Sequence, residues 1–224
     1  MSYIGTNKLG KIFLGTTAIG KAYLGTDLVF QTGPSLPAGY TRLQYVGTDS
    51  RAYVDTGVAG AKDLEVSVKW YAGTYVQYGA VYGNYMDESH KVNRAILNGT
   101  TTLFVAGGDN LAMSVGGSSI GAVHTLTVTK TVATLDGRDT NIAASSQQDN
   151  TTNICLGSRM ANPPTFRDIG LRIYSFSIKK AGELVINYIP CKRDSDSVAG
   201  FYDMVSESFV PSSTSTPFTA GPAF

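Results

Sequence analysis

Carboxylates at alternate positions of a strand are the residues in this sequence that would indicate hydrolytic chemistry. A glycosidase needs two of them across one sugar bond, one as the acid and the other as nucleophile or base. Asp63 and Glu65 have this spacing on an expected strand, but both lie at its beginning. Asp194 and Asp196 have the same spacing within a charged loop. We therefore expect both pairs to be solvated, and we predict that the protein is not an enzyme.

The two histidines offer the other route to catalysis. His90 and His124 are not accompanied by a nucleophile motif such as Gly-x-Ser-x-Gly. His124 begins an expected strand, which favours a structural role. His90 follows Asp87 and Glu88 in an expected loop, where the three side chains are either solvated or ligands for a divalent cation. We predict no catalytic residue and no metal site.

Two polar loops have side chains of the kind that binds calcium in lectin-like proteins. Residues 107–110 read Gly-Gly-Asp-Asn and residues 148–150 read Gln-Asp-Asn. Carboxylate and amide oxygens are calcium ligands, but Asp and Asn are also the usual residues of tight turns. The sequence leaves calcium binding open, and our prediction is that there is no cofactor.

Tyrosines gather in the glycine-rich stretch that follows Trp70. Tyrosine provides a large and rigid contact surface at a low cost in conformational entropy, and sugar binding requires aromatic platforms. The alternative is that about half of these rings face the core. We predict a ligand surface, with a cell-surface glycan as the candidate ligand, at Tyr75, Tyr78, Tyr82 and Tyr85.

The elements that position these residues are predicted to be strands. Residues 63–72 alternate strictly, with Leu64, Val66, Val68 and Trp70 on one face. Other short apolar runs recur between glycine and asparagine turns, and no stretch has a helical period, so we expect a sandwich or a barrel. We favour an all-β, antiparallel, two-sheet sandwich. A hairpin is expected at 124–139. Further strands are expected at 40–46, 52–58, 78–85, 95–97, 103–106, 111–115, 154–157, 171–179 and 184–190.

The first thirty residues contain a ten-residue repeat of an aliphatic residue followed by Gly-Thr, at residues 4–6, 14–16 and 24–26. Each unit predicts a short strand and a turn, which together would form a small β-meander. So few short strands are marginal in water, so they must pack on another surface. We expect either an extension of the sandwich or an anchor and oligomerisation module. The residues predicted to mediate assembly are Ile12, Phe13, Leu14, Tyr23 and Leu24.

Three regions follow from this organisation. Residues 1–33 form the repeat module, residues 34–39 are a linker rich in proline and glycine, and residues 40–224 form the sandwich with an extended C-terminal tail. The tail, rich in Ser, Thr, Pro and Gly, is expected to be extended along the sandwich edge.

Charge and cysteine content restrict the partners. The formal net charge is +1, so no basic surplus exists for nucleic acid. No segment approaches the roughly 20 apolar residues of a membrane span, so we expect no membrane insertion. We expect synthesis in a bacterial cytoplasm, where Cys155 and Cys191 would be reduced core thiols. A single bridge between them is the alternative.

Six strings of the second region form a pattern. They are Ala-Tyr-Val-Asp-Thr-Gly at 52–57, the strands at 171–178, 182–185 and 188–192, Gly-Phe-Tyr-Asp-Met-Val at 200–205, and residues 218–222. Together they resemble the concanavalin A-like, laminin-G-like jelly rolls of phage and prophage virion structural proteins. Residues 209–216 depart from the aromatic-asparagine-glycine pattern that is usual there. The N-terminal repeat is similar to modules at the start of tail-associated and head-associated phage proteins.

The resemblance implies a jelly-roll fold and a place in a virion, as a decoration, fibre or tail-associated protein, with other virion proteins as partners. It carries over no catalytic residue, because the group has no shared active site. We expect a homo-oligomer, with a trimer as the favoured state. The alternative is a carbohydrate-binding module that is not tied to a virion, and a glycoside hydrolase is the third reading.

Overall fold

The computed structural model describes the strands within residues 3–31 and then residues 35–48, 51–84, 93–97, 99–106, 113–142, 151–157 and 169–224. The chain divides into two compact units, Met1–Ala38 and Gly39–Phe224. All elements in these residues are strands. No helix long and apolar enough to cross a membrane occurs in this part of the chain.

The first unit consists of three hairpins that follow the sequence repeat. The pairs Ile4 with Asn7, Leu14 with Thr17, and Leu24 with Asp27 recur at a step of ten residues, one on each side of a Gly-Thr. Each hairpin is a separate two-stranded sheet in the described residues, so the continuous meander that we expected is not formed there. The hairpins are β1 (Tyr3–Ile4) with β2 (Asn7–Lys8), β3 (Ile12–Leu14) with β4 (Thr17–Ile19), and β5 (Lys21–Leu24) with β6 (Asp27–Gln31).

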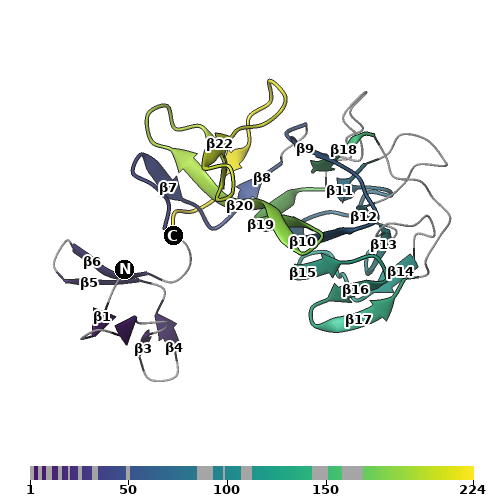
Figure 1. Ribbon diagram of the computed structural model, residues 1–224, viewed down its shortest axis with the longest axis horizontal. Coiled ribbons are helices and arrows are strands. Elements are labelled where there is room, and N and C mark those ends of the chain that lie inside the picture. The colour runs from purple at the N-terminus through teal and green to yellow at the C-terminus, as the bar shows by residue number, and fades with distance from the viewer. Residues whose placement is uncertain are drawn as a thin grey trace. The chain divides into compact units, whose positions relative to one another are not determined.

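The second unit contains two sheets, and every strand pair described in it is antiparallel. The large sheet has the order β17-β16-β15-β10-β19-β20-β21-β22, with β7, β8 and β23 attached to it (Figure 1). The six-stranded sheet has the order β14-β13-β12-β11-β18-β9.

The strands of the large sheet are β7 (Tyr40–Arg42), β8 (Val46–Gly47), β10 (Leu64–Ala72), β15 (Val123–Val128), β16 (Val132–Leu135), β17 (Arg138–Asn141), β19 (Leu171–Lys180), β20 (Glu183–Arg193), β21 (Ala199–Asp203), β22 (Ser208–Val210) and β23 (Thr219–Ala220). Those of the six-stranded sheet are β9 (Val54–Ala59), β11 (Ala80–Gly83), β12 (Arg94–Leu97), β13 (Thr102–Ala106), β14 (Met113–Gly116) and β18 (Asn153–Leu156).

Side chains from both sheets meet in one core, which makes the unit a sandwich. Along β10, Leu64, Val66, Val68 and Trp70 are buried, as their alternation predicts. Tyr82 of the six-stranded sheet and Phe176 of the large sheet lie with their ring centroids 6.1 Å apart. The prediction of an all-β protein with two antiparallel sheets is confirmed.

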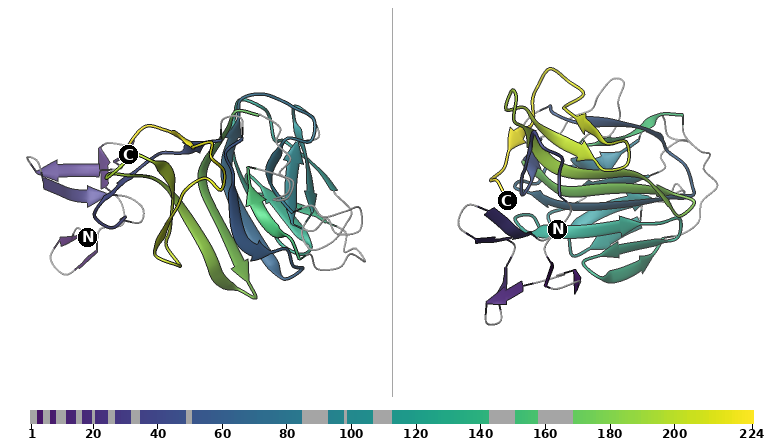
Figure 2. Two further views of the ribbon diagram at one scale, coloured as in Figure 1. Left: turned by 90° about the horizontal axis from the view of Figure 1, so that it is seen from above. Right: turned by 60° about the vertical axis from the view of Figure 1, so that its left-hand side comes forward.

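The C-terminal tail runs beside the segment that leads into the sandwich. The Ser213 N–H donates to the Tyr53 carbonyl over 2.8 Å, and the Gln44 N–H donates to the Pro222 carbonyl over 2.9 Å. β23 pairs with β8 between these two points (Figure 2). The Phe218 ring packs edge-on against Phe201 in the core. The tail therefore connects the two ends of the second unit.

The aspartate of the Gly-Phe-Tyr-Asp string closes a turn. The buried Asp203 carboxylate accepts hydrogen bonds from the N–H groups of Asn187, Val205 and Ser206 and from the Ser206 hydroxyl, at 2.7–3.3 Å. Gly200, three residues earlier, lies so close to β22 that a Cβ atom there would be 2.5 Å from the Val210 carbonyl oxygen. Both residues thus have structural roles.

The two cysteines are free and lie in different sheets. Cys155 belongs to β18 and Cys191 to β20, and both are buried. Burial raises the pKa of each thiol to about 12. The expected pair of core thiols is confirmed, and each thiol is neutral and unreactive near pH 7.

Candidate binding surface

A row of three aromatic rings and two cations lies on the face of the large sheet that points away from the core. We call Tyr71, Arg172, Tyr45, Tyr174 and Lys69 the cation–aromatic ladder. Lys69 and Tyr71 belong to β10, Arg172 and Tyr174 to β19, and Tyr45 immediately precedes β8.

The rungs of the ladder are in direct contact. The guanidinium carbon of Arg172 is 4.8 Å from the ring centroid of Tyr71 and 4.9 Å from that of Tyr45. The rings of Tyr45 and Tyr174 have centroids 5.5 Å apart, tilted by 59°. Lys69 Nζ lies 5.8 Å from the Tyr174 centroid. These distances are in the range of favourable cation–π contacts.

A β-bulge in β19 contributes to this arrangement. Lys69 pairs with Ser175 and Trp70 pairs with Ile173, so Tyr174 has no opposite residue in β10. Bulges redirect a side chain and are common next to functional sites. On the other side of β19, Arg172 pairs with Gly47, which places Tyr45 at the same face.

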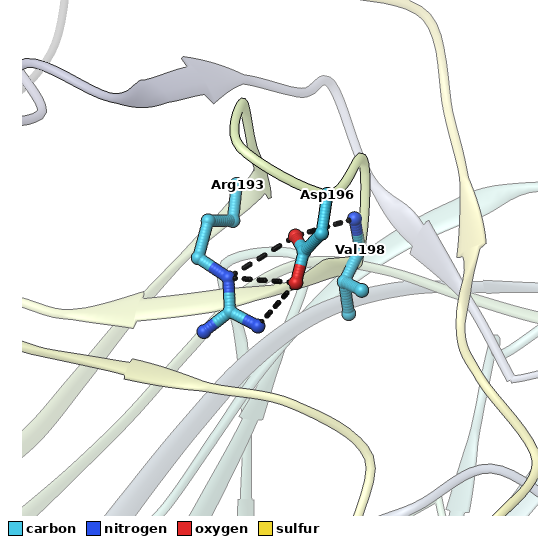
Figure 3. Close-up of polar contacts among 3 residues, drawn as sticks. All are labelled: Arg193, Asp196 and Val198. Carbon is cyan, nitrogen blue, oxygen red and sulfur yellow. Dashed lines mark hydrogen bonds and ion pairs between the residues drawn. The ribbon is translucent and has the colours of Figure 1, made fainter.

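The two cations of the ladder are exposed and have no acidic partner among the residues that the structure describes. Lys179, on the same sheet, donates to Glu65 over 2.8 Å. Arg193 of β20 holds Asp196 through Nη2 and Oδ2 at 2.6 Å (Figure 3). Lys69 and Arg172 are thus positive charges that remain available to a ligand.

The tyrosines predicted to bind a ligand are not all on the surface. Tyr75 and Tyr78 are 36% and 38% exposed, whereas Tyr82 is fully buried, and its place in the core is a correction to the predicted surface. Tyr82 lies in β11, whose four residues are all buried, and burial raises the pKa of its hydroxyl. Tyr85 lies outside the described residues.

The loop that carries Tyr75 and Tyr78 continues from the end of the ladder. Ala72, the last residue of β10, pairs with Leu171, the residue before Arg172. The Gly73 N–H donates to the Ile169 carbonyl over 2.9 Å. The Tyr78 N–H donates to the Leu97 carbonyl over 2.9 Å, and Tyr78 has a φ of 61°, which is rare for a bulky residue. Hydrogen bonds therefore fix both ends of this loop.

Three of the four carboxylates considered for catalysis have other partners, and the fourth, Asp63, is exposed. Glu65 accepts from Lys179, and Asp194 accepts from the Thr41 hydroxyl over 2.6 Å. Asp196 accepts from Arg193 and from the Val198 N–H (Figure 3). The hydrogen bonds from Arg193 hold the pKa of Asp196 below its usual value. The two predicted acid pairs therefore make the contacts of a solvated strand face and a closed loop.

His124 is buried and bonded at both ring nitrogens. Nδ1 is 2.6 Å from Asp136 Oδ2, and Nε2 is 2.9 Å from the Ser119 carbonyl oxygen. Both partners are acceptors, so only a ring protonated at both nitrogens donates to both of them. The Trp70 ring lies 5.3 Å away. These contacts explain His124 as a structural residue.

The contact with His124 contributes to a lowered pKa of Asp136. Its partial burial would raise its pKa, but the hydrogen bonds from His124 and from the Thr125 N–H, with the charges of His124 and Arg138, lower it overall.

The remaining predicted sites lie outside the described residues. This applies to Asp87, Glu88 and His90, and to the polar loops at 107–110 and 148–150. In the described ranges, no three His, Cys, Asp or Glu side chains come together as a metal site. The predicted assembly residues Ile12, Phe13 and Leu14 form β3, and Tyr23 and Leu24 lie in β5.

Comparison with known proteins adds no match. No family model, curated protein or solved structure resembles the chain at a significant level.

Proposed function

We propose that this chain is a structural protein of a phage virion, in which the hairpin repeat attaches the protein to the particle and the sandwich is displayed for attachment to a host surface. The observation that carries the proposal is the difference in construction between the two units. A ten-residue repeat forms three equivalent hairpins, and a sandwich with a core of its own follows it.

The proposal includes a concanavalin A-like jelly roll as the fold of the second unit. The strings that resemble the phage jelly rolls coincide with β9 and with the consecutive strands β19, β20 and β21 of the large sheet. Their spacing supports the resemblance, because these strands pair in chain order.

The hairpin repeat is the proposed assembly module. An isolated two-stranded hairpin is marginally stable in water, so the three hairpins gain stability from a further surface. Copies of the same chain provide that surface in a homo-oligomer, and other virion proteins provide it on the particle. A trimer is the state that we expect.

The test is incorporation into particles. The full chain and a chain lacking residues 1–33 are each supplied to particles that lack the protein, and purified particles are probed for both. We expect the shortened chain to fold, as checked by circular dichroism and a cooperative thermal transition, and to be absent from particles. Incorporation of the shortened chain at the level of the full chain would overturn the assembly role.

The exposed Tyr75 and Tyr78, in the loop that continues from the end of the ladder, favour a second candidate, a carbohydrate-binding module that is independent of a virion. Its requirement is a saturable affinity for a glycan that falls when the exposed Tyr75 and Tyr78 are replaced by alanine. Release of reducing sugar from the same glycan would instead indicate a glycoside hydrolase, which contradicts both candidates.

A further inference from the structure

We propose that the cation–aromatic ladder binds acidic saccharides. Arg172 binds a carboxylate of the saccharide, and the neighbouring tyrosines are stacking platforms for its sugar rings. This inference deepens the host-attachment part of the proposed function and rests on it. It names the chemical class of the ligand and the residue that selects it.

The position of the Arg172 side chain suits the binding of a planar anion. The ring centroids of Tyr71 and Tyr45 both lie within 4.9 Å of its guanidinium carbon, and these two contacts restrict the movement of the group. The N–H donors of a guanidinium point outward in its own plane, so an aromatic neighbour over the face leaves them free. A carboxylate fits two of these donors at once.

Arg193 has the acidic partner that Arg172 lacks among the described residues. It also lies over an aromatic ring, with its guanidinium carbon 4.7 Å from the Phe209 centroid. Its donors are occupied by the Asp196 carboxylate at 2.6–3.2 Å (Figure 3). The same side chain on the same sheet is thus satisfied in one place, and in the other it has no acid within the described residues. A ligand carboxylate would complete Arg172 as Asp196 completes Arg193.

The surroundings of the ladder favour a saccharide over a second protein surface. Beyond the ladder, the outer face of β10, β15 and β19 carries hydroxyls, among them Ser67 and Thr127, whose oxygens are 2.9 Å apart, and Ser177 opposite Ser67. Stable protein interfaces have an apolar centre. Apart from the tyrosines and the exposed Val123 opposite Tyr71, the outer positions of β10, β15 and β19 are polar. Hydroxyls can form hydrogen bonds with the hydroxyl groups of a sugar, and aromatic rings can stack on the C–H face of its ring.

The spacing of the charges favours a polymer. Arg172 and Lys69 stand at separate rungs, with Tyr45 and Tyr174 between them. Successive acidic residues of a chain can reach both cations while intervening rings stack on the tyrosines. An acidic monosaccharide has a single carboxylate, whereas an oligomer presents one for each cation, so oligomers should bind more tightly than the monosaccharide.

Binding is measured by calorimetry on the full chain, with trigalacturonate as the first probe and its methyl ester as the neutral control of identical size. Glucuronate-containing and sialate oligomers are the other acidic probes. We expect saturable binding of at least one acidic oligomer and no detectable binding of its neutral counterpart. Arg172→Gln should weaken that binding about tenfold or more, since a charge-assisted bidentate contact is lost.

Arg193→Gln is the matched control, because its donors already have a carboxylate, and it should leave the affinity unchanged. Arg172→Lys, which keeps the charge but loses the planar fork, should retain part of the affinity. Thermal unfolding of each variant checks that the sandwich is intact. Equal binding of acid and ester, unchanged binding by Arg172→Gln, or no binding of any acidic oligomer would overturn the inference.

Particle incorporation separates this inference from the proposed function. Arg172→Gln should enter particles normally, because the assembly role belongs to the hairpin repeat. A protein that incorporates but binds no acidic saccharide would contradict the ligand and leave the structural role standing. A protein that binds but does not incorporate would do the reverse.

Discussion

The two units of this chain differ in the sequence distance over which their strands pair. In the first unit each strand pairs with its immediate neighbour, and the register repeats every ten residues. In the second unit the central pair joins Leu64 to Lys180 and Ala72 to Leu171. Local pairing can be repeated but buries little, whereas long-range pairing creates a shared core. The comparison places the large core in the sandwich, and the proposed function gives attachment to the hairpins.

The largest effect is expected from removing a large ring from the core, which tests whether the sandwich provides the stability of the chain. Phe176 is fully buried and contacts the rings of Tyr82 and Tyr188. Phe176→Ala should lower the free energy of unfolding by about 3–5 kcal/mol, because it leaves a cavity. Denaturant unfolding measures the change. Phe13→Ala makes the same substitution in the hairpin unit, and an equal loss of stability in that variant would contradict the division of roles.

A smaller effect is expected where β21 and β22 pack closely. A methyl group at Gly200 meets the Val210 carbonyl oxygen at 2.5 Å and the Phe209 ring at 2.9 Å. Gly200→Ala should therefore destabilise the sandwich by about 1–3 kcal/mol. Gly116, at the end of β14, has no atom within 4 Å of an added Cβ, so Gly116→Ala is the control. The same shift in melting temperature for both variants would show that the contact at Gly200 relaxes freely.

The smallest effect is expected at the turn between β16 and β17, where the pairing is local although it belongs to the sandwich. The lowered pKa of Asp136 means that its ionised form stabilises the fold above the unfolded value of about 3.9 and that this contribution is lost as the pH falls through the folded pKa. The side chain is 42% exposed, so solvent screening keeps the effect below about 1 kcal/mol.

Asp136→Asn should therefore be less stable than the unmodified chain at pH 6, and the difference should shrink below pH 4. Thermal unfolding across this range measures it. In a His124→Gln background the pH-dependent difference should become smaller without vanishing, because the Thr125 N–H and the charge of Arg138 still lower the pKa of Asp136. A difference that persists unchanged to low pH would contradict the assignment.

The sequence predicts the strands well where one strand's own alternation decides its faces. Residues 63–72 are the best case, and β10 follows that pattern closely. The hairpin positions follow from the repeat for the same reason, since each Gly-Thr separates two short strands. The residues at which strands begin and end are predicted less well, because they depend on which neighbouring strand continues the hydrogen bonding.

The candidate surface could not be predicted in the same way. Tyr75, Tyr78 and Tyr82 are tyrosines of the same glycine-rich stretch, and the sequence does not distinguish them. The fold places the first two on the surface and the third in the core. The ladder joins Tyr71 to Arg172, residues a hundred positions apart, through the register of β10 with β19. The bulge at Tyr174 and the attachment of β8 complete it, and neither has a local signal. The outward alternation of Lys69 and Tyr71 was the one visible sign.

The most direct test of the central claim is the solution mass of the full chain and of residues 38–224, measured by light scattering at the same concentrations. We expect the full chain to be an oligomer, with a trimer as the favoured state, and the shortened chain to be a folded monomer. Two monomers would leave the hairpin repeat without a self-association role. A shortened chain that keeps the full oligomeric state would place assembly on the sandwich and contradict the division of roles between the two units.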